Sequence, residues 1–361
     1  MNDILIVGGS FDGNSGKPSK IVSGLAESFD NPRVVNGGHI DLVRNLSLDG
    51  VKCLVWMPNI DNSEPKILLD IKKRSPHLLL VSSKRVVEKE YSHFDIISRL
   101  LKTRSNLGIM VTKANDLYNF ELLDPLGNSF CSTSDIKTFS SSLNKRVEFL
   151  LNIKRESFQG DPGFSEETLA QAQSEIKGDY IELVKMYAQE FTEHVNAINP
   201  SRFLGNTSTR CMQGFPSQRG SGRGEILVSR RNVDKETLSK KDFVPLGNIP
   251  NCYGFGPNRF YIGSNKPSVD SPIQYRLYES LLNINFMIHG HVYVENAETT
   301  QEIIPCGGLQ EVDEVLSIVT DPITTSFVVN LRGHGFLAGG HTVNDLKGLK
   351  FVSRGLPEVH K

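Results

Sequence analysis

The fold of the C-terminal half is decided by the stretch Phe286-Met287-Ile288-His289-Gly290-His291-Val292-Tyr293-Val294, whose β-branched and aromatic residues predict a β-strand. Side chains alternate along a strand, so His289 and His291 should share one face. Gly290 lies between them and lacks a side chain, which lets the backbone come close to a neighbouring element. Two histidines on one face of an apolar strand indicate either a metal site or buried, hydrogen-bonded core residues.

Two more residues favour the metal site. His334 follows a second strand-like run, Ser326 to Leu331, and lies between Gly333 and Gly335, so its backbone is free to adopt an unusual conformation. Asp270 adds a carboxylate at the start of an expected helix. Three histidines and one carboxylate form a closed set of ligands for a borderline-soft divalent cation, with zinc as the first candidate.

The segment from about residue 191 to residue 345 resembles the class II aldolase and adducin-head family, a group of zinc-dependent sugar-phosphate enzymes. Five motifs carry the resemblance and occur in the family's order. They are Gly205-Asn206-Thr207-Ser208-Thr209-Arg210, Glu225–Ser229 with Leu238–Val244, Lys266-Pro267-Ser268-Val269-Asp270, His289-x-His291, and Leu331-Arg332-Gly333-His334-Gly335. The resemblance implies an α/β/α domain with a mainly antiparallel sheet, and a zinc ion bound by Asp270, His289, His291 and His334.

The resemblance also implies a reaction. It points to a lyase of the aldolase type or an epimerase that acts on a phosphorylated sugar, or a related hydroxy-carbonyl compound, through a zinc-stabilised enediolate. Asp270 would be a ligand at rest and a base once substrate enters. The anionic group of the substrate is expected at Gly205, Asn206, Ser229, Ser268 and at least one of Arg230 and Arg231.

Two further roles remain to be assigned, the hydrogen-bond acceptors of the histidines and the proton donor of the reaction. A metal-binding histidine needs an acceptor for its second ring nitrogen, and Glu295, Glu298 and Glu302 are the nearest carboxylates in the sequence. The family's tyrosine proton donor has no counterpart after Tyr293. His341 and Glu298 are then the nearest candidates for the proton donor.

The first part of the chain alternates short apolar strands with helices. Strands are expected at Ile4–Val7, Val51–Trp56, Leu78–Ser82 and Leu107–Thr112. Such alternation predicts a doubly wound parallel sheet, Rossmann-like or flavodoxin-like, with helices on both faces. We therefore expect one domain over residues 1–155, a linker around residues 157–164, and the metal-binding domain over residues 165–361.

The glycine-rich loop Gly8–Gly16 follows the first strand and precedes a helix, a position where loop amides and a helix N-terminus can bind phosphate. Phe11 and Pro18 exclude a Walker A motif, and the glycine spacing does not fit the dinucleotide fingerprint. A phosphorylated or nucleotide ligand and a loop that only turns the chain are equal alternatives here.

The composition of the chain indicates which classes of partner and which cellular compartment to expect. The formal net charge of the 361 residues is −1, so no overall field selects nucleic acid or a membrane surface, and no apolar run is long enough to span a bilayer. The 5 scattered cysteines form no C-x-x-C pair, which favours free thiols in a reducing cytoplasm.

The family resemblance implies a homo-oligomer, typically a cyclic tetramer, that binds a small phosphorylated substrate. Two other functions stay open at this point. One is a non-catalytic scaffold, as adducin heads are. The other is an enzyme whose chemistry lies in a nucleotide-binding or flavin-binding N-terminal domain.

Overall fold

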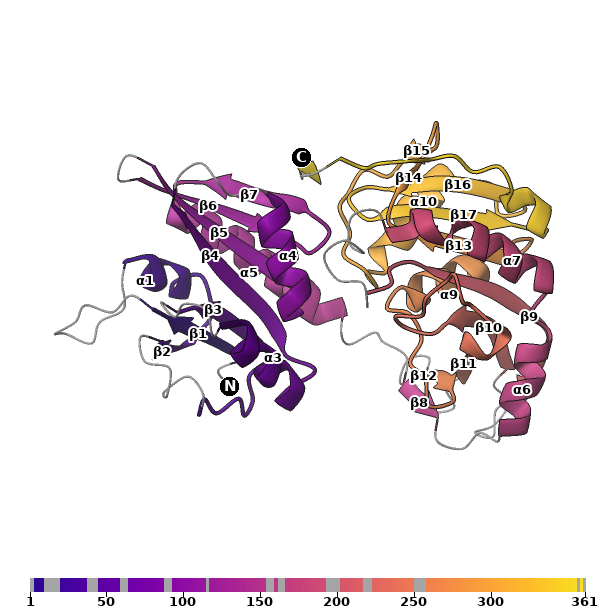
Figure 1. The fold of residues 1–361 in the computed structure, drawn as a ribbon, viewed down its shortest axis with the longest axis horizontal. Helices are drawn as coiled ribbons and strands as arrows, with labels where there is room; N and C mark the ends of the chain where they lie inside the picture. The colour runs from indigo at the N-terminus through magenta and orange to yellow at the C-terminus, as the bar shows by residue number, and fades with distance from the viewer. Residues whose placement is uncertain are drawn as a thin grey trace. The chain divides into compact units, whose positions relative to one another are not determined.

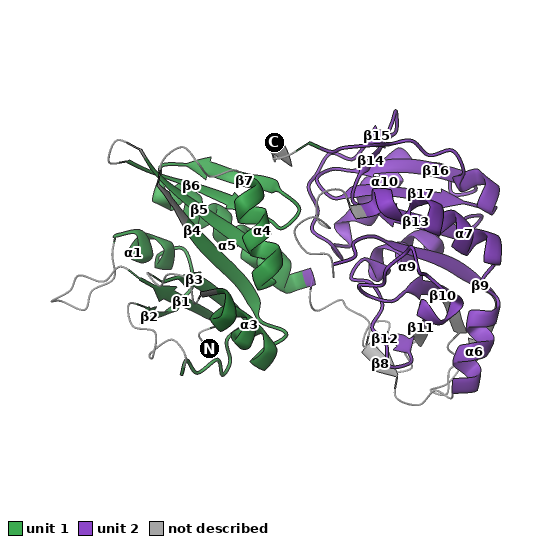
Figure 2. Ribbon diagram, in the orientation of Figure 1, with its two compact units in different colours: residues 1–152, 355–361 green, residues 153–354 purple. Residues whose placement is uncertain are grey.

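The computed structural model describes residues 3–9, 20–37, 45–58, 64–87, 93–114, 117–153, 159–161, 166–192, 202–216, 223–249, 258–355 and 358–359 (Figure 1). The chain divides into two compact units, residues 1–152 with 355–361, and residues 153–354 (Figure 2). The expected second domain ran to residue 361. Residues 355–361 instead belong to the first unit, where β19 (Glu358–Val359) pairs in parallel with β7 (Asn128–Thr133).

The first unit is built on an eight-stranded sheet with the order β19-β7-β6-β5-β4-β3-β1-β2. Five neighbouring strands are parallel: β1 (Ile4–Gly8), β2 (Arg33–Asn36), β3 (Cys53–Met57), β4 (Leu79–Val87) and β5 (Leu107–Ala114). The antiparallel strands β6 (Leu117–Leu123) and β7 extend the sheet beyond β5.

Helices cover both faces of this sheet because alternate residues of its strands are apolar on each side. In β1, Ile4 and Ile6 belong to the core under α1 (Lys20–Ala26) and α5 (Ile136–Ile153). Leu5 and Val7 belong to the core under α3 (Glu64–Arg74), and α4 (His93–Thr103) packs on the same side as α3. The predicted doubly wound α/β fold of this part is confirmed.

The second unit contains a nine-stranded sheet with the order β15-β16-β17-β13-β9-β10-β11-β12-β8. Its strands are β8 (Gln159–Asp161), β9 (Asn206–Pro216), β10 (Arg223–Ser229), β11 (Phe243–Ile249), β12 (Asn258–Ile262), β13 (Phe286–Gly290), β15 (Glu298–Thr299), β16 (Ser326–Leu331) and β17 (Gly335–Gly340). All neighbours pair antiparallel except β12 with β8 and β15 with β16. The predicted mainly antiparallel sheet is confirmed.

Two helical layers enclose this sheet (Figure 1). Phe286 and Ile288 of β13 share a core with α6 (Glu166–Ser174) and α7 (Gly178–Tyr187). Met287, between them, shares a core with α9 (Ser271–Ser280) and α10 (Gln310–Ile318) on the other face. By this alternation His289 projects toward the α9 and α10 side, which positions the site described below.

The predicted strand over residues 286–294 is broken in the structure. β13 ends at Gly290, and β14 (Tyr293–Val294) pairs instead with β18 (Phe351–Val352) in a separate two-stranded sheet. The backbone amide of His291 donates to the Phe191 carbonyl, 2.8 Å away, and so leaves the ladder of the large sheet. The strand therefore stops between the two histidines.

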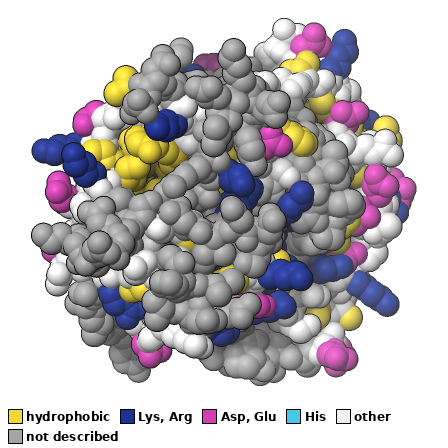
Figure 3. Space-filling view, turned by 60° about the vertical axis from the view of Figure 1, so that its left-hand side comes forward, with side chains coloured by type: hydrophobic (Ala, Val, Ile, Leu, Met, Phe, Trp, Pro, Cys, Tyr) yellow, Lys and Arg dark blue, Asp and Glu magenta, His cyan; other side chains and the backbone are white. Residues whose placement is uncertain are grey.

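Some expectations concern residues that are not described. Residues 10–16 of the glycine-rich loop and most of the expected linker lie outside the described residues. Within the described part of the chain, no helix combines the length and apolar character needed to cross a membrane. Basic and acidic side chains both occur on the face drawn in Figure 3, consistent with the net charge of −1.

Candidate metal centre

Side chains from four parts of the second unit meet on the α9 and α10 side of its sheet. Asp270 directly precedes α9, His289 and His291 lie at the end of β13, Cys306 precedes α10, and His334 occupies the turn between β16 and β17. Asp270 is 7% exposed, and the three histidines are 2%, 5% and 0% exposed in chain order. Only Cys306 is partly exposed. The group is thus a buried cluster of metal-binding residue types.

The ligand atoms of the cluster are close together. His289 Nε2 lies 3.8 Å from Asp270 Oδ2, and His334 Nε2 lies 3.9 Å from Asp270 Oδ1. Cys306 Sγ lies 3.2 Å from His334 Nε2. One ligand atom from each of Asp270, His291, Cys306 and His334 lies within 4.8 Å of all the others. The structure brings the four predicted ligands together and adds a cysteine that the sequence analysis did not include.

These distances fit a divalent ion. Bond lengths in tetrahedral zinc sites place neighbouring ligand atoms about 3.4–3.6 Å apart. The separations of 3.2, 3.8 and 3.9 Å lie close to that value. Among the residues that the structure describes, nothing hydrogen-bonds to the buried His289 Nε2 or His291 Nδ1. An unpaired buried polar atom costs about 1–3 kcal/mol, so a bound ion would stabilise this arrangement.

Two of the histidines are held by hydrogen bonds in an orientation that suits metal binding. His289 Nδ1 donates to the Phe336 carbonyl at 2.7 Å, and His334 Nδ1 donates to the carboxylate of Glu311, whose two oxygens both lie 3.0 Å away. Each bond leaves Nε2 facing the cluster. Glu311 itself is only 2% exposed.

The expected acceptors for the histidines were therefore wrong. The Phe336 carbonyl accepts from His289, and the Glu311 carboxylate accepts from His334. The expected carboxylates Glu295, Glu298 and Glu302 are exposed and do not accept from these two rings. Proximity in sequence was the wrong guide, because Glu311 reaches His334 across 23 residues of chain. A usable signal was the position of Glu311 in the first turn of α10, next to Val312 of the buried helix face.

The Asp270 carboxylate accepts hydrogen bonds from other segments of the chain instead of capping α9. Asp270 is the N-cap residue of α9, yet its side chain makes no capping hydrogen bond. Instead Oδ1 accepts from the Gly307 amide at 2.8 Å, and Oδ2 accepts from Asn206 Nδ2 at 3.4 Å. The positive end of the helix dipole favours a carboxylate at this position. Asp270 is thus oriented toward the histidines by contacts from the start of β9 and from the turn before α10.

The three histidines of the cluster differ in the direction in which their pKa values are shifted. Burial, reinforced by His334, lowers the pKa of His289 to about 4, and burial lowers the pKa of His291 well below 6.5. Burial also opposes protonation of His334, but Cys306 and Glu311 outweigh it and raise its pKa well above 6.5. Burial raises the pKa of the Cys306 thiol. His289 and His291 are consequently neutral near pH 7, the form that binds metal.

The residues expected to bind the substrate's anion are partly gathered here. Asn206, the first residue of β9, lies directly across from His289 of β13, and its Nδ2 also donates to Ser268 Oγ at 3.1 Å. Gly205 has a φ of +72°, and a Cβ atom there would lie 2.5 Å from the His289 carbonyl oxygen. A glycine is therefore required for this close approach. Asn206 thus contacts both Ser268 and Asp270, and Gly205 packs against the backbone of His289.

The remaining three lie at the end of the neighbouring strand β10 and directly after it. The Ser229 hydroxyl is buried and accepts from the Thr207 amide at 3.1 Å. Arg230 Nε pairs with Asp242 Oδ1 at 2.8 Å. Arg231 Nε donates to the Pro267 carbonyl at 3.4 Å, and its charge interacts with Asp270. Arg231 therefore belongs to the Asp270 side of the site, whereas Arg230 is engaged by Asp242.

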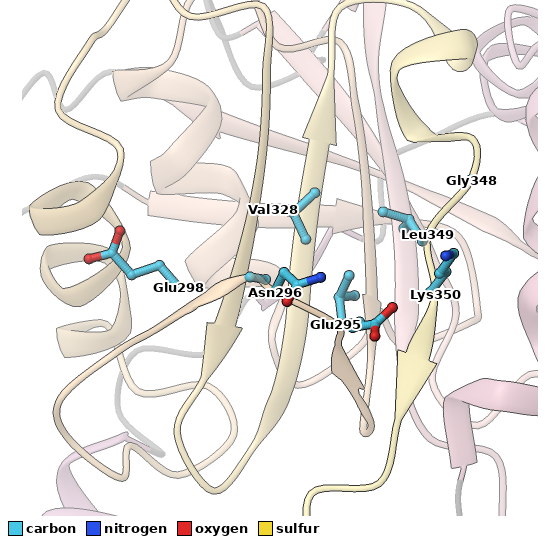
Figure 4. Close-up of a pocket in the computed structure, with 9 residues that line it drawn as sticks. Glu295, Asn296, Glu298, Val328, Gly348, Leu349 and Lys350 are labelled. Carbon is cyan, nitrogen blue, oxygen red and sulfur yellow. The ribbon is translucent and has the colours of Figure 1, made fainter.

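Neither candidate proton donor lies at the cluster. His341 follows β17 at the end opposite His334, and its Nδ1 is 2.7 Å from the Asn283 carbonyl. Glu298 is exposed on the edge strand β15 and lines a different cavity of about 470 Å³ (Figure 4). The other residues around that cavity are Val294, Glu295, Asn296, Ala297, Val328, Gly348, Leu349 and Lys350. None of them belongs to the cluster.

Comparison with known proteins gives only distant likenesses. No family model and no curated protein matches the chain. Among solved structures, a DNA/pantothenate metabolism flavoprotein from Streptococcus pneumoniae is 10% identical with a TM-score of 0.29, and the match covers 40% of this chain and 96% of that one. The C-terminal domain of the coenzyme A biosynthesis bifunctional protein CoaBC is 14% identical with a TM-score of 0.30, over 41% and 95%.

A third structure, an aldolase II superfamily protein from Pseudomonas syringae, is 13% identical with a TM-score of 0.26, over 49% of this chain and 74% of that one. Likenesses at this level assign neither a family nor an activity. The side chains of the cluster are therefore the feature that bears on function.

Proposed function

We propose that the chain is a metal-dependent enzyme, a lyase of the aldolase type or an epimerase, that acts on an anionic hydroxy-carbonyl compound such as a phosphorylated sugar. One observation carries the proposal. Three buried histidines surround Asp270, and two of their ring nitrogens, His289 Nε2 and His291 Nδ1, have no hydrogen-bond partner within the described parts of the chain. A scaffold gains nothing from such a group, because unpaired buried polar atoms destabilise the fold.

The cluster has the donors for one divalent ion. Asp270, His289, His291 and His334 would hold it, and imidazole nitrogens together with a carboxylate suit zinc. When bound, the ion would supply Lewis-acid stabilisation of the negative charge that develops on substrate oxygens. Glu311 and the Phe336 carbonyl would keep two of the imidazoles in the required tautomer.

The chain's own residues would orient the substrate and move the proton. Asp270 is the carboxylate at the centre of the site, and its Oδ1 is fixed by the Gly307 amide at 2.8 Å. In this orientation Asp270 would accept the proton next to the substrate carbonyl. Asn206 and Ser268, hydrogen-bonded to each other at 3.1 Å, would orient the polar end of the substrate. The Arg231 guanidinium would pair with its phosphate or carboxylate.

Elemental analysis and a hydrogen-exchange assay test the proposal together. The purified chain should bind close to one equivalent of zinc, and the His291→Ala variant should bind none. Incubated in D₂O with dihydroxyacetone phosphate as a simple probe, the zinc-loaded chain should incorporate deuterium next to the carbonyl, as followed by NMR. The Asp270→Asn variant should not.

The two measurements separate the enzyme from a scaffold. A folded wild-type chain that takes up no divalent ion would overturn the proposal and favour a binding protein. A zinc-loaded chain that exchanges no hydrogen with any phosphorylated hydroxyketone or aldose would leave a metal site but refute the proposed chemistry.

A further inference from the structure

Cys306 is attached to the cluster through both its side chain and its backbone turn. Its Sγ lies 3.2 Å from His334 Nε2. The next residue, Gly307, donates its amide hydrogen to Asp270 Oδ1 at 2.8 Å. The turn before α10 is therefore fixed on two members of the cluster, and the sulfur points at the same space as their ligand atoms.

The Cys306 sulfur lies close enough to the other ligand atoms to bind the same ion. The set whose ligand atoms all lie within 4.8 Å of one another consists of Asp270, His291, Cys306 and His334. A sulfur and a nitrogen bound to the same tetrahedral zinc ion are about 3.6 Å apart. The observed 3.2 Å is reached from that value by a shift of a few tenths of an ångström.

The two ring nitrogens of His334 contact different residues of the site. Glu311 accepts from His334 Nδ1, and His334 Nε2 on the other side of the ring lies against the Cys306 sulfur. An ion bound here would have the Cys306 thiolate and His334 Nε2 among its ligands, and the protons of these groups would be released to solvent.

We infer that Cys306 is a thiolate ligand of the proposed metal ion, so that it joins Asp270, His291 and His334 as a donor, and His289, 3.8 Å from Asp270, would be a further ligand. The inference rests on the proposed metal site and specifies its chemistry. A sulfur donor selects borderline and soft ions such as Zn²⁺, Co²⁺ and Cd²⁺ over Mg²⁺ and Mn²⁺, which prefer oxygen. The site would thus be a mixed nitrogen, oxygen and sulfur centre.

Cobalt substitution tests the sulfur bond directly, because thiolate-to-cobalt charge transfer absorbs in the near ultraviolet and ligands without sulfur give no such band. The Co²⁺-loaded wild type should show this band together with visible bands of the metal. Cys306→Ser should lose the ultraviolet band and keep the visible ones. Cys131→Ser is the matched control, since Cys131 is also partly exposed but lies in β7 of the first unit, and this variant should keep both.

The outcomes separate this inference from the proposed function. A wild type that binds no Co²⁺ refutes the metal site itself. Co²⁺ bound without the ultraviolet band, or a band that survives in Cys306→Ser, leaves the metal site and refutes Cys306 as a ligand.

A second measurement does not depend on any variant folding. Zinc should protect Cys306 of the wild type from alkylation by iodoacetamide, as read by mass spectrometry of its peptide. Equal labelling of Cys306 with and without zinc would overturn the inference.

Discussion

Glu311 holds His334 in place, with both carboxylate oxygens 3.0 Å from the imidazole Nδ1. A carboxylate behind a metal-binding histidine fixes the ring and increases its basicity. Removing the charge in Glu311→Gln should weaken zinc binding about 10-fold, and removing the side chain in Glu311→Ala up to about 100-fold. Competition with a chelator of known affinity measures both.

The matched control for this prediction is Asp313→Asn, an exposed carboxylate on the same helix. Its zinc affinity should equal that of the wild type. If Glu311→Gln and Asp313→Asn bind zinc equally well, the Glu311 contact does not support the metal site.

Metal removal should destabilise the second unit. A ligand that binds only the folded state, present at 100 times its dissociation constant, adds about 2.7 kcal/mol to the free energy of unfolding. We therefore expect EDTA to lower the melting temperature of the wild type and zinc to restore it. His291→Ala should melt at the same temperature with and without EDTA. A chelator-sensitive melt of this variant would place the ion elsewhere in the chain.

The sequence was sufficient to predict the part of the site that depends on local periodicity. Strand alternation predicted one face for His289 and His291, and both reach the cluster although β13 ends at Gly290 between them, while the strand Ser326–Leu331 placed His334 at its end. Asp270 was expected at the start of a helix and is the N-cap residue of α9. The parallel sheet of the first unit was predictable for the same reason, because its strands are short, apolar and separated by helices.

Local patterns could not predict Cys306 and Glu311. Their approach to His334 depends on where α10 packs against the sheet, and that position follows from the tertiary packing of Val312 and Val315 rather than from any spacing near the histidines. The same limit applies to β8 and β19. Each of these short strands joins its sheet in parallel with a strand about 100 or more residues away in sequence.

A buried lysine near the site should make stability depend on pH. Lys235 is 3% exposed, its Nζ donates to the Leu204 carbonyl at 2.9 Å, and burial lowers its pKa from 10.5 to about 7. The unfolded chain therefore binds this proton more tightly, so the contribution of Lys235 becomes more favourable as the pH rises from 7 to 10.5. At pH 7 the penalty is roughly 4 kcal/mol.

Lys235→Met removes that penalty but also the hydrogen bond to Leu204, which offsets about 1–3 kcal/mol. The variant should be more stable than the wild type at pH 7, and the difference should shrink toward pH 10. Urea unfolding at both pH values measures it. Lys241→Met, at an exposed position, should show no pH-dependent difference from the wild type. A stability gain for Lys235→Met that grows with pH would contradict the buried-lysine argument.

The two arginines that follow β10 should differ in their effect on anion binding. Arg231 interacts with Asp270, whereas Arg230 is paired with Asp242 at 2.8 Å. A charge-assisted hydrogen bond contributes about 1.5–3 kcal/mol, so Arg231→Ala should weaken binding of inorganic phosphate by about 10-fold to 150-fold. Arg230→Ala should change phosphate affinity little. Isothermal titration of the zinc-loaded variants measures both affinities, and their zinc content should stay equal to that of the wild type. Unchanged phosphate affinity in both variants would mean that this basic segment is a solvated surface and that the substrate need not be anionic.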